Sequence, residues 1–570
     1  MSRRFWSWLV VGLLVTLGLI LLVFGAGAQA DQSSPSRLIT GLVYDPQGQG
    51  VEGVEVAALG PEPDAILATG VTQADGRYTL DIADKVPESL SLHLSRAHFA
   101  ETQMDLDLAS IEALKSGQTA VLPDTTLPRS IGPAFWVATA IFAVVLITIA
   151  LGKLHNTLAA LAGATLILGV SYLSHVIFEG LFVFDFEGAL GYVDWNVIFL
   201  IMGMMIVIAV VERTGIFQWL AFMAYRISGG RVWLLVPILM IITGLGSAFL
   251  DNVTTMLLMT PITIQIAMAI GLNPLALLMP EVMASNVAGV STLVGTPTNI
   301  LIGSYAGITF NGFLKNLTPG VLLALLGLVI YSELAYRRQL RQAEAPSPML
   351  LERLAERARI TEPDQLKKAG WVGAGMLVLF VLGERIHLLP SVTALIGATA
   401  LLLWIRPDIE EMIEAVDWTT LVFFMALFIV VGAIQEVGLI SMIADLIGRL
   451  VGGSLILAML AILWLGALLS TVVANIPFTA AMLPVVGYLT GIVPGAENRA
   501  LFYALSVGSG MGGNGSLIGA SANMVTAGIT ERAGYPITYF DFLKKGLPAL
   551  FITVGLAGGW LLVRFLLLGG

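Results

Sequence analysis

Four short polar segments interrupt otherwise apolar stretches of this chain, and they form two matched pairs. The first pair is Asp251-Asn252-Val253-Thr254-Thr255 with Asn475-Ile476-Pro477-Phe478-Thr479, and the second is Gly295-Thr296-Pro297-Thr298-Asn299 with Gly519-Ala520-Ser521-Ala522-Asn523. Because Gly and Pro interrupt a helix, they free backbone NH and carbonyl groups. Free NH groups at the N-terminus of a half-helix suit an anion, whereas free carbonyls with Asn, Ser and Thr oxygens suit a small cation such as sodium.

These segments therefore supply the candidates for binding a substrate and a coupling ion. The candidates are Asp251, Asn252, Thr254, Thr255, Gly295, Thr296, Asn299, Asn475, Thr479, Gly519, Ser521 and Asn523. We expect a sodium site near Asn299 and Asn523, where amide and hydroxyl oxygens gather. The alternative interpretation is that Gly and Pro only permit close helix packing. One such motif leaves this alternative open, but four motifs at related positions argue against it.

Two acidic residues, Asp251 and Glu281, lie inside apolar surroundings. An ionisable side chain at a helix centre costs about 2.5–3.5 kcal/mol on insertion scales, so its presence suggests a role in ion coupling. Ala474 aligns with Asp251 in the second half, so this carboxylate belongs to the first half alone. Asp251 also fits a cap for a half-helix beginning near Val253, and Glu281 also fits a position near the membrane surface.

An internal repeat relates the two halves of the chain. Val193-Asp194-Trp195 recurs as Val416-Asp417-Trp418, at an offset of 223 residues (417 − 194). The same offset relates Gly215 to Gly438, Ser247 to Ser470, Asn252 to Asn475 and Pro261 to Pro484. After one inserted residue the offset is 224, and it relates Gly295 to Gly519 and Asn299 to Asn523. The predicted spans between the two copies are odd in number, which makes the copies inverted. Inverted repeats with a site between them near the midplane are typical of secondary transporters.

The composition predicts the elements that position these segments. Of 570 residues, 57% are hydrophobic and 12% are charged, against about 25% charged in soluble domains. From residue 131 onward, apolar runs recur at about 20 residues, the length at which a helix spans a bilayer. We predict an all-α polytopic membrane protein with two inverted repeats, each with a re-entrant hairpin (231–270 and 454–490) and a broken helix (275–308 and 500–528).

The N-terminal region differs from the membrane segments in its pattern. Residues 1–30 carry Arg3 and Arg4, an apolar run and Ala28-Gln29-Ala30, which fits a secretory signal peptide or an N-terminal anchor. Residues 31–128 alternate polar and apolar residues between turn sequences, which predicts a small β-sandwich. We expect this exported domain on the extracytoplasmic side of the membrane.

A basic linker divides the two halves. Eight Lys and Arg residues lie between Arg337 and Lys368, so the positive-inside rule places this linker in the cytoplasm. The predicted domains are therefore repeat 1 at 131–336, the cytoplasmic linker at 337–368 and repeat 2 at 369–570. The predicted location is the cell (inner) membrane, which the chain crosses several times.

The sequence argues against several classes of function. The chain contains no cysteine, which excludes disulfides, thiol nucleophiles and zinc–thiolate sites. It has no basic stripe for nucleic acid and no Gly-x-x-x-x-Gly-Lys-Ser/Thr sequence for ATP. Gly508-Ser509-Gly510 suggests an intramembrane protease, but no histidine is placed to act as its base. We therefore predict no enzyme activity and no cofactor, with membrane lipid and a small ion as partners.

The polar motifs resemble those of a known family. The segments 251–261, 295–299 and 519–525 are similar to the ion transporter superfamily, in the branch of ArsB-type arsenite pumps, NhaD-type sodium/proton antiporters and the melanosomal P protein, which share a citrate-transporter-like domain. The resemblance covers residues 135–567. It implies a scaffold with a moving transport unit, a homodimer and, for arsenite-pump-like members only, an ATPase subunit. Residues 41–78 resemble the carboxypeptidase-regulatory domains.

Together these features predict a secondary active ion transporter that moves a small anion or cation, coupled to sodium or protons. The resemblance implies that Asn299 and Asn523 occupy positions where dicarboxylate carriers use Ser-Asn-Thr motifs for sodium and carboxylate. This chain departs from that pattern, since Thr298 and Ala522 precede the two asparagines. One alternative is a sodium/proton antiporter of the NhaD type, and another is a passive anion channel of the same fold.

Overall fold

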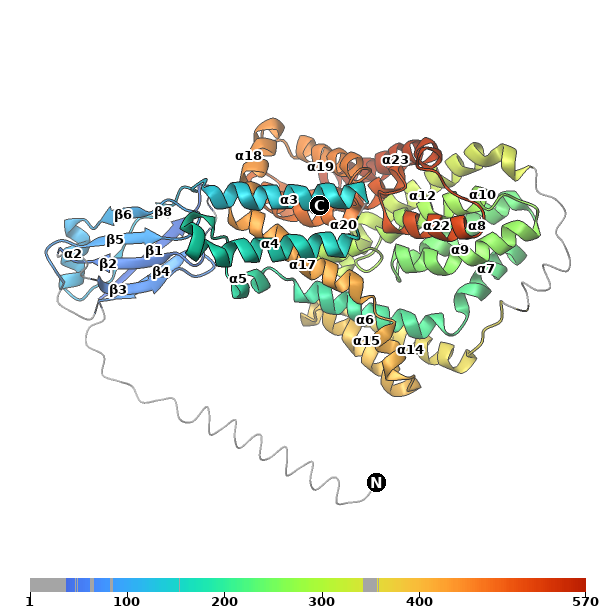
Figure 1. The fold of residues 1–570 in the computed structure, drawn as a ribbon, viewed down its shortest axis with the longest axis horizontal. Coiled ribbons are helices and arrows are strands. Elements are labelled where there is room, and N and C mark those ends of the chain that lie inside the picture. Colours follow the sequence, from blue (N-terminus) through green and yellow to red (C-terminus); the bar gives the residue numbers. More distant parts are fainter. Residues whose placement is uncertain are drawn as a thin grey trace, which may run out of the picture. The chain divides into compact units, whose positions relative to one another are not determined.

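The computed structural model describes residues 37–341, 356 and 358–569, except for 47, 49, 62–65, 83–85 and 153. The predicted signal peptide or anchor at 1–30 lies outside the described residues, as does the middle of the basic linker. The described chain forms two compact units, one up to Ser130 and one from Ile131 onward (Figure 1).

The first unit is a small β-sandwich, as predicted, with two four-stranded sheets (Figure 1). One sheet has the order β4-β1-β7 with β8 also paired to β1, and the other has the order β3-β2-β5-β6. The strands are β1 (Leu38–Tyr44), β2 (Glu55–Leu59), β3 (Ile66–Val71), β4 (Arg77–Asp81), β5 (Ser91–Ser95), β6 (Thr102–Asp105), β7 (Ala120–Val121) and β8 (Thr125–Thr126). The sequence pattern predicts β1, β2, β4 and β5. It misses β3, whose residues are all exposed or half-buried, and the shorter β6, β7 and β8.

Local chemistry shapes this unit. Gly41 of β1 lies opposite Tyr78 of β4, and a Cβ at Gly41 would lie 2.5 Å from the Tyr78 hydroxyl oxygen, so glycine leaves room for the ring. Burial raises the pKa of Tyr78 to about 12. Asp107 caps α2 (Leu108–Lys115) by accepting a hydrogen bond from the Ser110 backbone NH at 2.9 Å. The interaction with Ser110 lowers the pKa of the Asp107 carboxyl.

The second unit is helical. The helices of its first half are α3 (Pro133–Leu151), α4 (Asn156–Ile177), α5 (Phe186–Gly191), α6 (Trp195–Glu212), α7 (Ile216–Ile227), α8 (Val232–Ser247), α9 (Asn252–Ala269), α10 (Leu275–Gly289), α11 (Pro297–Ala306) and α12 (Phe310–Leu340). Those of its second half are α14 (Pro363–Leu382), α15 (Pro390–Ile405), α16 (Ile409–Glu414), α17 (Trp418–Glu436), α18 (Leu439–Val451), α19 (Leu455–Leu469), α20 (Asn475–Ile492), α21 (Ala500–Gly512), α22 (Ser521–Arg532) and α23 (Tyr539–Leu562). Short 3₁₀ or π segments are η1 (Glu179–Leu181), η2 (Gly383–Ile386), η3 (Ala496–Asn498), η4 (Gly513–Gly515) and η5 (Val563–Leu567). Among the described residues, nine helices are long and apolar enough to cross a membrane, which agrees with the predicted polytopic fold.

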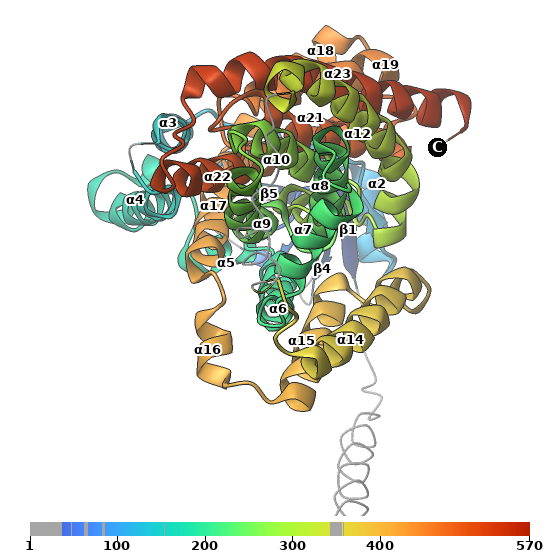
Figure 2. The ribbon, with the colours of Figure 1, turned by 90° about the vertical axis from the view of Figure 1, so that its right-hand side faces the viewer.

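The helices repeat in order and in packing. α3 and α4 lie beside α17, while their counterparts α14 and α15 lie beside one another and against α6 (Figures 1 and 2). Likewise α11 packs on α20, and its counterpart α22 packs on α9. Each repeat thus contacts the other in a reciprocal way, as expected for copies related by a pseudo-two-fold axis. This arrangement confirms the two predicted inverted repeats.

Matching residues begin and end the matching helices. Asp194 caps α6 by accepting hydrogen bonds from two backbone NH groups of the first turn, and Asp417 caps α17 by accepting one from the Thr420 NH. Gly215 and Gly438 both adopt left-handed conformations, with φ of 75° and 90°. Because glycine adopts this conformation without strain, it turns the chain from α6 into α7 and from α17 into α18.

The predicted hairpins and broken helices are present. α8 and α9 form the first hairpin and turn at residues 248–251, whereas α19 and α20 form the second and turn at 470–474. The first broken helix consists of α10 and α11, interrupted at 290–296, and the second consists of α21 and α22, interrupted at 513–520. The four polar segments therefore lie where helices end inside the fold.

Candidate functional site

A cavity of about 570 Å³, here called the hairpin cavity, lies between both hairpin tips, both broken helices and helices α4, α6 and α17. The N-termini of both hairpin helices α9 and α20 and of α11 and α22 reach it, as do those of α4 and α17. The first turns of α9 and α20 contribute Val253 and Ile476, and those of α11 and α22 contribute Pro297 and Ser521. Among these, the N-termini of α11, α20 and α22 carry no side-chain cap in the described structure, and their partial positive charge and free NH groups favour a bound anion. The volume suits a small organic ion.

Acidic side chains line the same cavity. Glu212 ends α6, Asp251 begins α9 and Asp417 begins α17. Among the described lining residues the cavity has no Lys or Arg, and His155 is the remaining titratable side chain. Carboxylates without basic neighbours favour a cation. The hairpin cavity therefore combines groups that favour an anion with groups that favour a cation.

The cavity also shows the relative direction of the two repeats. α6 lines it with residues from Ile201 to Glu212, which belong to its C-terminal two-thirds. α17 lines it with Thr419, Thr420 and Phe423, which belong to its first turns. Since opposite ends of two equivalent helices meet one cavity, α6 and α17 run in opposite directions.

Asp251 caps α9 from a strained backbone position. Its φ is 82°, a value that non-glycine residues rarely adopt. Its Oδ1 accepts hydrogen bonds from the backbone NH groups of Val253 at 2.7 Å and Thr254 at 2.9 Å, and its Oδ2 accepts one from the Thr254 hydroxyl at 2.8 Å. The Thr255 hydroxyl donates to the Asp251 carbonyl at 2.6 Å. The capping role inferred as an alternative from the sequence is thus present, and Asp251 still lines the cavity.

The second hairpin tip presents a different surface. Ala474 occupies the position equivalent to Asp251 and lines the same cavity. Within the described part of the chain, no side chain caps α20. Asn475 and Thr479 are buried, and the Thr479 hydroxyl donates to the Asn475 carbonyl at 2.7 Å. The N-terminus of α20 therefore faces the cavity uncapped, where that of α9 carries a carboxylate.

Asn299 and Asn523 hold the interrupted backbone of the two broken helices. The Nδ2 group of Asn299 donates to the carbonyls of Val290 at 2.9 Å and Thr292 at 2.7 Å. Asn523 repeats this arrangement with two carbonyls of its own loop, at 2.7 and 2.9 Å. Both side chains are fully buried. These bonds therefore give buried carbonyls of the interrupted backbone a side-chain donor.

A chain of buried amides joins the two repeats. Asn252 donates to Asn286 at 2.9 Å, and Asn286 donates to Asn514 and to Asn523, both at 3.0 Å. None of these side chains is more than 4% exposed. Because two of them belong to each repeat, the chain fixes the first hairpin tip against the second broken helix.

Three members of these networks are not predicted from the sequence. Asn286, Asn514 and Ser506 are fully buried, and Ser506 donates to Oδ1 of Asn299 at 2.5 Å. The sequence feature that could identify them is that each is a polar residue within a predicted apolar span. Uncharged polar residues are common in membrane helices, so this signal alone does not single them out.

The predicted site residues fall into separate places. Those that line the hairpin cavity are Asp251, Thr254 and Ser521. Those that make hydrogen bonds behind it are Asn252, Thr255, Asn299, Asn475, Thr479 and Asn523. Those in the loops of the broken helices are Gly295, Thr296 and Gly519. Glu281 lies apart from all of these, fully buried between α8, α9 and α10.

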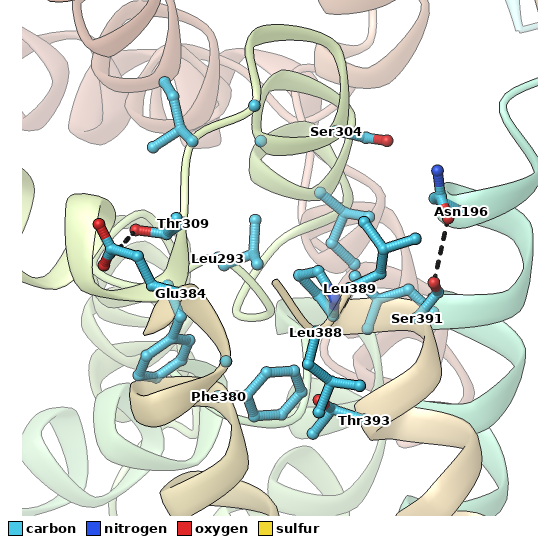
Figure 3. A pocket seen from close by; sticks show the side chains of 18 of the residues that line it. Asn196, Leu293, Ser304, Thr309, Phe380, Glu384, Leu388, Leu389, Ser391 and Thr393 are labelled. Carbon is cyan, nitrogen blue, oxygen red and sulfur yellow. Dashed lines mark hydrogen bonds between the residues drawn. The ribbon is translucent and has the colours of Figure 1, made fainter. Parts of the chain in front are cut away.

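A second cavity, here called the α15 cavity, has a volume of about 510 Å³. It lies at the N-terminal end of α6 and is also lined by the end of α11 and by the turn from α14 into α15. Figure 3 shows its polar edges, where Thr309 donates to Glu384 at 3.2 Å and Ser391 donates to Asn196 at 3.1 Å. Apolar side chains lie between these two pairs (Figure 3).

One residue, Ile300, lines both cavities. It belongs to α11, whose first residue Pro297 lines the hairpin cavity and whose later residues Gly303 and Ser304 line the α15 cavity. α11 and the loop before it therefore separate two cavities at opposite ends of α6.

Comparisons with known proteins agree on the nature of this fold. The sequence matches the citrate transporter family, CitMHS, over residues 143–508. An uncharacterized transporter of Mycobacterium tuberculosis is 35% identical over 434 residues, which cover 76% of this chain and 99% of that relative. The P protein of Homo sapiens is 32% identical over 517 residues, which cover 76% of this chain and 60% of that protein.

A solved structure resembles the second unit in fold. The crystal structure of the YdaH transporter of Alcanivorax borkumensis has a TM-score of 0.50 and 15% sequence identity, and the match covers 76% of this chain and 98% of that one. The sequence matches confirm the resemblance to the ion transporter superfamily that the polar motifs indicate. This chain therefore belongs to the citrate transporter (CitMHS) family of membrane transporters.

Proposed function

We propose that this transporter is a secondary active carrier that moves a small anion, coupled to protons or sodium ions. The observation that carries the proposal is the convergence of the uncapped N-termini of α11, α20 and α22 on the hairpin cavity, with the carboxylate of Asp251 beside them. The N-termini supply an anion-binding field, and the carboxylate supplies a group that can hold a coupling cation. The match to the citrate transporter family supports an organic anion as the substrate.

The two cavities support transport by alternating access. A carrier needs a barrier that closes one side while the other side is open. α11 and Ile300 stand between the hairpin cavity and the α15 cavity. Because α11 belongs to the first broken helix, movement of the hairpins and broken helices against α6 and α17 would also move this barrier, closing the hairpin cavity and opening the site toward the α15 cavity.

The proposed orientation follows from the basic linker. A cytoplasmic linker places the C-terminal end of α6, with Glu212, on the cytoplasmic side. The hairpin cavity then faces the cytoplasm, and the β-sandwich lies on the extracytoplasmic side of the inner membrane. We further propose a homodimer. An ATPase subunit is required only if the protein acts like an arsenite pump.

Two other functions draw on specific features of the same cavity. Glu212, Asp251 and Asp417 favour a sodium/proton antiporter of the NhaD type, in which cations are the transported species. The uncapped helix N-termini also suit a passive anion channel. Such a channel needs a continuous path past Ile300, which lies between the two cavities.

One added charge tests anion binding at the uncapped N-terminus of α20. Ala474→Asp places a carboxylate at the position that Asp251 occupies in the first repeat, and its charge repels an anion. Citrate, phosphate and arsenite are each tested for thermal stabilisation of the purified protein and for uptake into proteoliposomes. We expect the anion that binds the wild type to lose about tenfold or more in affinity, since ~1.4 kcal/mol of repulsion gives that factor.

The matched control is Ala474→Asn, which supplies a cap without a charge and should keep the affinity of the wild type. Equal anion affinity in Ala474→Asp and the wild type contradicts the proposed site. Uptake that follows a proton or sodium gradient supports the carrier, whereas uptake independent of both supports the channel. Sodium-driven proton movement in the absence of any anion supports the antiporter.

A further inference from the structure

We propose that Glu281 is a proton-binding site of the first repeat and that the proton is the ion coupled to transport. The second part of this inference rests on the proposed carrier function. Glu281 lies in the middle of α10 with 0% of its surface exposed. It is the only acidic residue of α10, and the sequences of α8 and α9 contain none. The carboxyl is therefore enclosed within a three-helix bundle of apolar character.

Threonine hydroxyls surround the Glu281 carboxyl. Thr243 of α8 donates to its Oε1 at 2.6 Å. Thr263 of α9 faces the same carboxyl without completing a hydrogen bond. Within the described residues, Oε2 of Glu281 and the hydroxyls of Thr260 and Thr263 have no hydrogen-bond partner. A buried carboxylate needs a counter-charge or a full set of donors, so this arrangement suits a neutral, protonated carboxyl.

The neighbouring elements supply no counter-charge. α10 packs against α8, α9, α12, α21, α22, α23 and η4. The titratable residues of these elements are Lys315, Tyr331, Glu333, Tyr336, Arg337 and Arg338 on α12, Tyr503 on α21, Glu531 and Arg532 on α22, and Tyr539, Asp541, Lys544 and Lys545 on α23. In the described structure none of them forms a hydrogen bond or an ion pair with Glu281.

The contact geometry favours a proton over a sodium ion. Thr243 and Glu281 are joined by a direct hydrogen bond of 2.6 Å, which leaves no room for a metal ion between their two oxygens. Glu281 also lines neither the hairpin cavity nor the α15 cavity. A proton requires no cavity, so it can bind the Glu281 carboxyl without movement of the surrounding side chains.

The second repeat makes the same packing with apolar residues. Ser247 donates to the Ser285 carbonyl at 2.8 Å, and Ser470 donates to the Ser509 carbonyl at 2.9 Å, which fixes the alignment of the two bundles. The offsets of 223 (470 − 247) and 224 (509 − 285) pair Thr243 with Gly466, Thr260 with Leu483, Thr263 with Val486 and Glu281 with Leu505. The bundle therefore forms without any of these polar groups, and packing alone does not account for Glu281.

A polar route leads from Glu281 toward the hairpin cavity. Ser285 lies one helical turn from Glu281 on the same face of α10. Its hydroxyl donates to the Asn252 carbonyl at 3.4 Å. Asn252 follows Asp251, which lines the hairpin cavity. Polar groups therefore lie between the buried carboxyl and the hairpin cavity.

Infrared difference spectroscopy tests proton binding without any substrate. The purified full-length protein in lipid nanodiscs is cycled between mildly acidic and mildly alkaline buffer, while the carbonyl stretch of protonated carboxylic acids is followed. We expect a reversible band that is lost in Glu281→Gln, kept in Asp251→Asn and shifted in frequency in Thr243→Val, which removes the donor to Oε1. Gln has the shape and donors of a protonated Glu, so the variant should stay folded, and thermal unfolding checks this.

Two outcomes overturn the proton site. One is a band that persists unchanged in Glu281→Gln, and the other is a Glu281 carboxyl that stays protonated over the whole range while the protein remains folded. Thr243→Val keeps the test decisive if Glu281→Gln fails to fold, because an unshifted band then contradicts the assignment. Failure of anion binding in the Ala474→Asp experiment leaves the infrared band unaffected, so the two proposals fail separately.

The coupling part of the inference is tested by transport. Proteoliposomes containing the wild type or Glu281→Gln are loaded with the anion that stabilises the purified protein. We expect Glu281→Gln to exchange this anion across the membrane at the rate of the wild type, but to lose about tenfold or more of the uptake driven by a pH gradient. Uptake that still follows the pH gradient in Glu281→Gln overturns the coupling role.

Discussion

The two repeats share one hydrogen-bonded framework but differ in where they carry ionisable groups. Asn299 and Asn523 bridge the interrupted helices with nearly the same pair of bonds. By contrast, Asp251 has Ala474 as its counterpart, and Glu281 has Leu505. The framework is therefore a requirement of the fold in both copies. The two carboxylates occur in the first repeat alone, so we assign ion coupling to that repeat and substrate contact to both.

The centre of the fold shows the same kind of difference. The offset of 224 pairs Asn286 with Gly510 (510 − 286) and Val290 with Asn514 (514 − 290). Asn286 and Asn514 are hydrogen-bonded at 3.0 Å. The equivalent residues Gly510 and Val290 are instead packed so closely that a Cβ on Gly510 would lie 2.5 Å from a Val290 methyl carbon. One contact of the pseudo-two-fold pair is thus polar, and the other is small and apolar.

The largest predicted effect tests the shared framework. Asn299→Ala and Asn523→Ala each remove two hydrogen bonds to buried carbonyls and one to a buried side chain of Ser506 or Asn286. Since a buried hydrogen bond contributes about 1 kcal/mol, the three lost bonds should lower the free energy of unfolding of each variant by about 3 kcal/mol. Chemical unfolding in mixed micelles measures the loss. A large loss in one variant and none in the other would break the equivalence of the repeats.

The next prediction concerns the loops of the broken helices. A Cβ at Gly295 would lie 2.5 Å from the Gly289 carbonyl oxygen and 2.8 Å from that of Ser247, whereas at Gly519 the nearest backbone atoms are 3.0 Å away. Backbone atoms do not yield easily in a packed interior. We expect Gly295→Ala to cost about 2–3 kcal/mol and Gly519→Ala about 1 kcal/mol less. Thermal unfolding of the two variants side by side measures the difference, and a larger effect at Gly519 would contradict it.

The symmetric framework is more predictable from the sequence than the asymmetric contacts. Gly, Pro and Asn at constant offsets predict the hairpins and broken helices, because a helix interrupted inside a membrane needs these residues. The mismatch of Asp251 with Ala474 is also visible in the sequence, since a charge in an apolar run stands out. The hydrogen-bond partner of Asn299 is not visible in the sequence, because Ser506 lies 207 residues away and belongs to the other repeat. Periodicity predicts which residues share a helix face, but it does not predict which helices of different repeats meet.

A smaller effect separates the two roles of Asp251. Asp251→Ala removes three hydrogen bonds to the first turn of α9 and should cost about 1–2 kcal/mol of stability. Asp251→Asn keeps the cap and tolerates the positive φ, so its stability should stay within ~0.5 kcal/mol of the wild type. Any loss of gradient-driven uptake in Asp251→Asn then reports the missing charge. Unchanged uptake in this variant would assign Asp251 to capping alone.

The smallest predicted effect is also the strictest test of symmetry. Ser247 and Ser470 end equivalent helices, are fully buried and donate to equivalent carbonyls at 2.8 and 2.9 Å. A single neutral hydrogen bond contributes about 1 kcal/mol, so Ser247→Ala and Ser470→Ala should each lose that amount, within ~0.5 kcal/mol of one another. Ser247 lies one turn from the Glu281 cluster and Ser470 lies beside its apolar equivalent. A clear difference between the two losses would therefore mean that the surroundings of the two equivalent bonds differ in energy, whereas equal losses support a symmetric framework.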